Sequence, residues 1–254
     1  MTRSLEGKIA VVTGAAAGVG YGIAEALASE GATVVVADLH QEAIDRAVAG
    51  LGGSAWGRVA DVSNLSQVEA LYSHVKQRHG RLDLVIANAG IGDHAALGAI
   101  TEEQFDRTFA VNVKGVLFTV QAALPMMPRG GSVVIIGSTG SDLPPPGMSL
   151  YGASKAAVRT LVRSWVYDVQ AMGLRINVLS PGTVNTQSLR TALVRALGAE
   201  RGTAAVEAIS ARSPSGRIGE PREIGRVTAF LCSDAASYIN GVELFVDGGM
   251  RAAV

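Results

Sequence analysis

Short runs of consecutive apolar residues alternate along the chain with longer stretches in which apolar positions recur every three or four residues. The runs lie at 9–12, 33–37, 54–60, 82–87, 132–136, 175–179 and 242–246. Strands that are apolar on consecutive positions indicate a parallel sheet whose two faces are both covered by helices. The pattern therefore predicts one doubly wound α/β domain over residues 1–254, with a parallel sheet of about seven strands and helices on both faces.

Residues with chemically useful side chains or backbones lie at or just past the ends of several predicted strands. They are Gly14, Asp38, Asp61, Asn88, Ser138 and Pro181. Because ligands of open parallel sheets bind beyond the carboxyl ends of the strands, we expect these residues to meet at one edge of the sheet.

The first predicted strand leads through Gly14-x-x-x-Gly18-x-Gly20 into a predicted helix. This order directs backbone N–H groups and the positive helix end at a phosphate, and glycines let the phosphate approach closely. The spacing differs from Gly-x-Gly-x-x-Gly and lacks the lysine of a P-loop, which disfavours a kinase or an ATPase. A glycine-rich turn that serves only strand–helix packing is the alternative interpretation.

Asp38 ends the second predicted strand. A carboxylate at this place accepts hydrogen bonds from the adenosine ribose and repels a 2′-phosphate, so the sequence favours NAD over NADP. The following Leu39 and His40 offer no fixed positive charge to a 2′-phosphate. As an alternative or additional role, Asp38 could cap a helix that begins near Gln41.

Tyr151 and Lys155 are four positions apart in a predicted helix and should share one face. A lysine near a phenol stabilises the phenolate and lowers the phenol pKa, and a second positive charge, such as an oxidised nicotinamide ring, would lower that pKa further. Lowering a tyrosine pKa from about 10 to near 7 requires about 4 kcal/mol, and one unit charge about 4 Å away supplies a comparable energy. We therefore expect Tyr151 to exchange protons near neutral pH, the alternative being a solvated pair.

Composition restricts the classes of partner. The 254 residues include 22 basic and 22 acidic ones, so no broad field attracts nucleic acid or a membrane surface. With 48% hydrophobic and only 17% charged residues, the chain suggests a homo-oligomer. The single Cys232 excludes an intrachain disulfide, no histidine has the spacing of a metal site, and the polar start predicts a cytoplasmic protein.

These motifs occur together in the order and spacing of a known family. Thr13-Gly14-x-x-x-Gly18-x-Gly20, Asn88-Ala89-Gly90, Asn112, Ser138, Tyr151-x-x-x-Lys155 and Pro181-Gly182 resemble the short-chain dehydrogenase/reductase family, and the likeness extends from Gly7 to Gly249. Residues 151–159 and 176–182 are similar to bacterial NAD-dependent ketoreductase and alcohol dehydrogenase members. The resemblance implies a Rossmann-type fold, and a homotetramer assembled through long helices near 102–127 and 150–171.

The resemblance also implies an oxidoreductase that transfers a hydride between NAD(H) and a secondary alcohol or ketone. Tyr151 would be the general acid and base, Ser138 would bind the same substrate oxygen, Lys155 would hold the nicotinamide ribose, and Asn112 would hold a water. The implied cofactor contacts are Gly14, Gly18, Val19 and Gly20 for the pyrophosphate; Asp38 and Leu39 for the ribose; Asp61 and Val62 for the adenine; Asn88, Ala89 and Gly90 for the groove floor; and Pro181, Gly182, Val184 and Thr186 for the nicotinamide. No metal is implied.

Two segments should shape the substrate pocket, the proline-containing loop 139–150 and a lid at 185–215 within the single domain. Their residues do not identify the small-molecule alcohol or ketone. Two other functions remain as alternatives, a catalytically silent dinucleotide-binding sensor or scaffold and an isomerase or lyase that uses the cofactor transiently. Two site residues also have simpler interpretations, since Ser138 could be a turn serine and Asn112 could only bond a neighbouring carbonyl.

Overall fold

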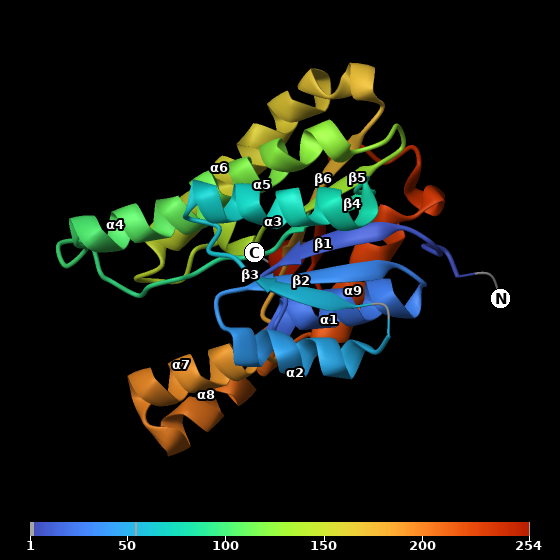
Figure 1. Ribbon diagram of the computed structural model, residues 1–254. Coiled ribbons are helices and arrows are strands. Elements are labelled where there is room, and N and C mark those ends of the chain that lie inside the picture. The colour runs from blue at the N-terminus through green and yellow to red at the C-terminus, as the bar shows by residue number, and fades with distance from the viewer. Residues whose placement is uncertain (1–2, 54, 254) are drawn as a thin grey trace.

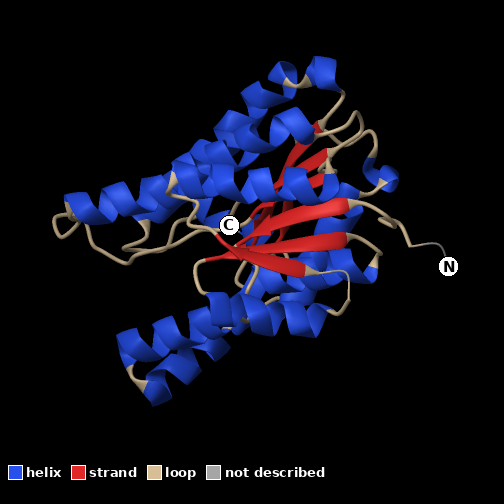
Figure 2. Cartoon of the chain, in the orientation of Figure 1, coloured by secondary structure: helices blue, strands red, loops and turns tan. Residues whose placement is uncertain are grey.

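A computed structural model describes residues 3–53 and 55–253 and contains one seven-stranded sheet (Figures 1 and 2). The strands are β1 (Ile9–Thr13), β2 (Thr33–Asp38), β3 (Trp56–Val59), β4 (Leu84–Ala87), β5 (Ser132–Ile136), β6 (Arg175–Pro181) and β7 (Glu243–Val246). All neighbouring strands pair in parallel, in the order β3-β2-β1-β4-β5-β6-β7. The predicted α/β class and parallel sheet are confirmed.

Helices cover both faces of the sheet, as the apolar strands require. The helices are α1 (Gly18–Ser29), α2 (Gln41–Leu51), α3 (Leu65–His79), α4 (Glu102–Phe109), α5 (Val116–Ala123), α6 (Ser149–Asp168), α7 (Gln187–Leu197), α8 (Ala199–Arg212) and α9 (Pro221–Cys232). One core layer joins α1, α2 and α9 to the sheet, and the other joins α3, α5 and α6 to it. Alternate side chains of each strand enter the two layers, since Val11 lies in one and Val12 in the other.

The strand order reverses between β1 and β4. The chain proceeds from β1 through β2 to the edge strand β3, and then returns to place β4 on the other side of β1. Where two parallel strands diverge in this way, their carboxyl ends leave a crevice in which ligands bind. Thr13 links the two strands there, because its Oγ1 accepts hydrogen bonds from the backbone N–H groups of Asn88 at 3.1 Å and Ala89 at 3.2 Å.

Several element boundaries differ from those predicted. β3 begins at Trp56, and Ser54 of the predicted strand lies outside the described residues; β6 continues to Pro181, because it pairs with β7 as far as Val246. The predicted long helix 102–127 is interrupted by a π-helix at Ala110–Gly115 between α4 and α5. A π-helix accommodates one residue more per turn and is found mostly at functional sites.

By length and composition alone, the stretch Glu102–Met126 could cross a membrane, although only 33% of its most apolar window is buried inside the chain. A core helix of a globular domain meets the same criteria. Here the α5 portion packs Val116 and Val120 into the core beside the sheet.

The lid region predicted at 185–215 contains α7 and α8, which form a helical hairpin extending from the body of the domain (Figure 1). Gly202 allows the two helices to pack closely, since a Cβ at this position would lie 2.9 Å from the Cα of Val194. The hairpin leaves the body at Thr186, whose side chain caps α7, and returns at Ser215, whose N–H bonds to the carbonyl of Gly248 at 3.1 Å.

Candidate active site

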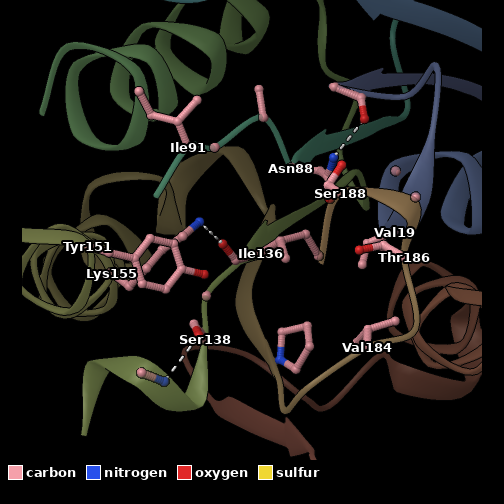
Figure 3. A pocket seen from close by; sticks show the side chains of 18 of the residues that line it. Val19, Asn88, Ile91, Ile136, Ser138, Tyr151, Lys155, Val184, Thr186 and Ser188 are labelled. Carbon is pink, nitrogen blue, oxygen red and sulfur yellow. Dashed lines mark hydrogen bonds between the residues drawn. The ribbon is translucent and has the colours of Figure 1, made fainter. Parts of the chain in front are cut away.

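A cleft of about 740 Å³ opens at the carboxyl ends of the strands, beside the crevice between β1 and β4 (Figure 3). It brings together every residue implied as catalytic or cofactor-binding except Asn112, which is fully buried and lies outside the lining. In Figure 3, Tyr151 and Lys155 lie on one side of the cleft, whereas Asn88 and Thr186 lie on the other.

The glycine loop presents free backbone donors to the cleft. Among the described residues, no side chain caps the first turn of α1, whose N-cap Ala17 is extended. The N–H groups of that turn are therefore available to an anion, and the helix dipole favours one. Gly14 has φ of +63°, and a Cβ on it would lie 3.0 Å from the Cα of Ala89, so only glycine fits this bend.

Asp38 braces the same loop. One carboxylate oxygen accepts from the N–H of Ala16 at 2.9 Å, and the other accepts from the N–H of Leu39 at 2.7 Å. The interpretation of Asp38 as a cap for α2 is wrong, because the N-cap residue is His40. Since each carboxylate oxygen can accept more than one hydrogen bond, Asp38 can still receive ribose hydroxyls in the cleft that it lines.

Asn88 holds the two sides of the crevice together. Its amide nitrogen donates to the carbonyls of Thr13 at 2.9 Å and Gly14 at 3.0 Å. Both amide hydrogens of the side chain are consumed in this way. Asn88 therefore shapes the groove floor and the glycine loop through the backbone of β1.

Tyr151 and Lys155 share one face of α6, as the four-residue spacing predicts, with the ammonium nitrogen 5.9 Å from the centroid of the tyrosine ring. Lys155 is only 3% exposed and donates to the carbonyl of Ile136 at 2.8 Å. This bond fixes α6 to the end of β5, immediately before the loop that carries Ser138. Lys155 is buried and Tyr151 is partly buried in the cleft wall, so the interpretation as a solvated surface pair is wrong.

The electrostatics differ from the expectation for Tyr151. Burial raises the pKa of Tyr151, and a hydrogen bond with Ser138 opposes part of this rise. Burial also lowers the pKa of Lys155 to about 8. Without a bound cofactor, the net shift of the Tyr151 pKa is therefore upward, because desolvation of the phenol is its largest cause. Bringing this phenol toward neutrality needs a further positive charge in the cleft.

Ser138 has two roles in the structure. Its Oγ accepts from the N–H of Gly140 at 3.0 Å, which caps the 3₁₀ turn Thr139–Ser141 and agrees with a turn serine. Figure 3 shows the same hydroxyl turned toward that of Tyr151, at the edge of the cleft. The turn thus holds Ser138 in position beside Tyr151.

Asn112 follows its simpler interpretation. Within the π-helix, its amide nitrogen donates to the carbonyl of Ile91 and to Oγ of Ser154, and its oxygen accepts from the N–H of Ile91. These contacts join the segment after β4 to α6, since Ser154 donates in turn to the carbonyl of Tyr151 at 2.7 Å. That Asn112 also holds a water stays a prediction.

The rest of the cleft wall comes from segments in which the sequence alone does not identify the contacting side chains. Pro181, Gly182, Val184 and Thr186 line the cleft as implied. Sequence reasoning located the loop 139–150 and the lid but not their individual contacts, and it missed the segment after β7 altogether. The additional lining side chains at this end are those of Ile91, Leu143, Pro145, Met148, Leu189 and Met250.

The strand order and the uncapped glycine loop define a dinucleotide-binding α/β domain. A family profile described as enoyl-(acyl carrier protein) reductase matches residues 14–251. The chain is 42% identical to the oxidoreductase asL5 of Sarocladium schorii, covering 98% of this chain and 97% of that protein. It is 36% identical to the 3-oxoacyl-[acyl-carrier-protein] reductase FabG of Thermotoga maritima, covering 97% of this chain and 98% of the other.

Among solved structures, a short-chain glucose/ribitol dehydrogenase from Brucella melitensis superposes with a TM-score of 0.90 at 29% identity, covering 98% of this chain and 99% of that one. The chain therefore belongs to the short-chain dehydrogenase/reductase family, whose members bind nicotinamide dinucleotides. It is an oxidoreductase acting on CH–OH or C=O groups.

From the lowered pKa of Lys155 we predict how the free energy of unfolding depends on pH. Because this pKa falls from 10.5 to about 8 on folding, the unfolded chain binds more protons between these values, and the free energy of unfolding should rise with pH across that window. Lys155→Met removes this pH-dependent contribution to the free energy of unfolding. The difference between the free energies of unfolding of the wild type and the variant should therefore increase by about 2 kcal/mol between pH 8 and 10. Urea unfolding followed by circular dichroism measures it. Lys76→Met, at an exposed position of α3, is the control, and a difference that does not change with pH would contradict the burial of a charge.

Proposed function

We propose that the chain is an NAD-dependent oxidoreductase that interconverts a secondary alcohol and a ketone, with Tyr151 as general acid and base. The observation that carries this proposal is the arrangement of Tyr151, Ser138 and Lys155 at one part of a cleft that also contains Asp38. The glycine loop fits a dinucleotide, because its free N–H groups and positive helix end suit a pyrophosphate.

The bound cofactor supplies or accepts the hydride. The chain supplies the proton: Tyr151 donates to the carbonyl oxygen during ketone reduction and removes the alcohol proton during oxidation. Ser138 orients the same oxygen by a hydrogen bond, since its hydroxyl faces that of Tyr151. Holding the reacting oxygen between two hydroxyl groups fixes its place relative to the dinucleotide groove.

Lys155 supports the phenol in two ways. Its ammonium is held by the carbonyl of Ile136, so it stays on the cleft side of α6 and can also reach a ribose hydroxyl. Its charge favours the phenolate, but burial raises the pKa of Tyr151 and opposes this effect. The positive charge of an oxidised nicotinamide adds to that of Lys155, and we infer that the phenol becomes a competent base in the oxidation direction only with the cofactor in place.

Replacing Tyr151 with Phe removes the proton donor and leaves the ring. We expect kcat for the best alcohol or ketone in a substrate panel to fall by about 10³-fold, because general acid–base catalysis contributes on that scale. NADH affinity, measured by fluorescence titration, should change by less than about twofold, since the ring packing is retained. Tyr167→Phe is the matched control, because Tyr167 is 76% exposed at the far end of α6. Unchanged steady-state rates in the Tyr151 variant would reject its role.

The choice of NAD rests on Asp38, whose carboxylate lines the cleft beside Leu39 and would repel a 2′-phosphate. In the double variant Asp38→Ser with Leu39→Arg, the ratio of kcat/KM with NADPH to that with NADH should rise by at least about 100-fold, as a repulsion is replaced by an ion pair. The ratio is the informative quantity, because losing the bond to Ala16 affects both cofactors alike. Asp45→Ser, on the exposed side of α2, should leave the ratio unchanged. A constant ratio in the double variant would place cofactor selection elsewhere.

A catalytically silent sensor is the competing function. Such a protein would bind NADH in the same groove and show no substrate-dependent change in NADH absorbance with any member of a broad ketone and alcohol panel. The full set Ser138, Tyr151 and Lys155 favours turnover, because a sensor does not require a proton donor in its groove.

We also propose a homotetramer, and the incomplete burial of the apolar stretch Glu102–Met126 supports self-association. Only 33% of the most apolar window of this stretch is buried within one chain, and Phe105 is 46% exposed. Light scattering coupled to size-exclusion chromatography should give about four times the chain mass of 26.1 kDa, and a mass of one chain would refute the proposal. Residence in the cytoplasm remains our expectation, with a single, buried and free Cys232, and cell fractionation tests it.

A further inference from the structure

The turn at Met250–Ala253 follows β7 and places Met250 in the cleft wall. Two adjacent glycines produce the bend, because Gly248 and Gly249 have φ of +65° and +86°, which other residues rarely adopt. Asp247 stabilises it, accepting from the N–H groups of Gly249 at 2.9 Å and Arg251 at 2.8 Å. The bend directs the chain back over the carboxyl end of the sheet.

Arg251 fastens this turn to the catalytic part of the cleft. Its Nε donates to Asp142 at 2.8 Å, and its guanidinium carbon lies 4.2 Å from the ring centroid of Phe245 on β7. Asp142 ends the 3₁₀ turn that begins after Ser138, and it also pairs with Arg159 of α6. These two arginines lower the pKa of Asp142, so the anchor is ionised at neutral pH. The turn and the Ser138 loop thus form one connected wall.

The side chains at this end of the cleft are apolar. Leu143, Pro145, Met148, Leu189 and Met250 contribute to it. Among the described residues that line the cleft, three are charged: Asp38, Asp61 and Lys155. Asp38 ends β2 and Asp61 follows β3, both on the nucleotide side of the cleft, and the ammonium of Lys155 already donates to the carbonyl of Ile136. A carboxylate or phosphate on the substrate would therefore lose its hydration without gaining a partner.

From this wall we propose that the substrate is an uncharged ketone or alcohol with a bulky apolar substituent, that Met250 is a specificity-determining residue contacting that substituent, and that Arg251 positions Met250. The inference rests on the proposed function and adds the substrate class to it. A methionine suits this place, because its flexible thioether follows irregular apolar shapes.

The test measures binding, so it does not depend on turnover. Isothermal titration calorimetry in the presence of NAD⁺, with which a ketone yields no product, compares methyl ketones whose second substituent is methyl, hexyl or naphthyl. Wild-type affinity should increase along the series, and pyruvate should bind more weakly than acetone. Met250→Ala should weaken binding of the naphthyl ketone about tenfold more than that of acetone. Equal weakening along the series, or tighter binding of the keto acid, would overturn the inference.

A double-mutant cycle tests the role of Arg251. Arg251→Ala should reduce the preference for the naphthyl ketone in the wild-type background and have no further effect in the Met250→Ala background, because it acts through Met250. Arg251→Lys should restore part of the preference, whereas Arg46→Ala, at an exposed position of α2, should leave it unchanged. Additive losses from the two substitutions would refute the positioning role.

The same series separates this inference from the proposed function. Ketones that bind with the expected preference but are not reduced by NADH would contradict the proposed function and leave the apolar subsite established. If small ketones are reduced but larger apolar ketones bind no more tightly, the result would support the proposed function and overturn the apolar subsite.

Discussion

The site depends on the hydrogen bond between the buried ammonium of Lys155 and the carbonyl of Ile136. A charged amine that is only 3% exposed must have a partner, and the carbonyl of Ile136 provides one at 2.8 Å. That bond joins α6 to the end of β5 and so sets the position of Tyr151 relative to the loop of Ser138. Burial also lowers the pKa of Lys155 to about 8, because the charged amine loses its hydration. The hydrogen bond thus sets the geometry around Tyr151, whereas burial sets the electrostatics.

The glycine loop shows a similar combination of roles. Asp38, which would select the cofactor, also holds the N–H of Ala16, and Asn88 holds the carbonyls of Thr13 and Gly14. The loop therefore has its shape before any ligand binds, and little conformational entropy needs to be lost when a pyrophosphate approaches. If Asp38 also selects the cofactor, as we propose, the choice of cofactor is coupled to the conformation of the phosphate loop.

The sequence predicted those features that depend on residues close together in the chain, namely the strands and the shared face of one helix. Consecutive apolar positions identified the strands, and the four-residue spacing placed Tyr151 and Lys155 on one helix face. The direction of the pKa shift of Tyr151 was not predictable, since desolvation depends on the packing of distant segments. The π-helix around Asn112 and the wall at Met250 were not predicted either, because they also depend on contacts between distant segments. Asp142 and Arg251, which fix that wall, are 109 positions apart.

The cleft divides into a part with strict geometry and a part with variable chemistry. The groups that we propose to position the dinucleotide and move the proton lie on strand ends and on α6, where backbone hydrogen bonds allow little displacement. The apolar wall instead comes from the loop after Ser138, the α7–α8 hairpin and the Met250 turn. Side-chain contacts such as that of Arg251 with Asp142 help to hold these segments together, beside the backbone hydrogen bond of Ser215 with Gly248. Changes in such contacts alter which substituent fits without moving Tyr151. Specificity can therefore change while the proton-transfer geometry is retained, and for this reason the family's shared motifs do not reveal the substrate of a given chain.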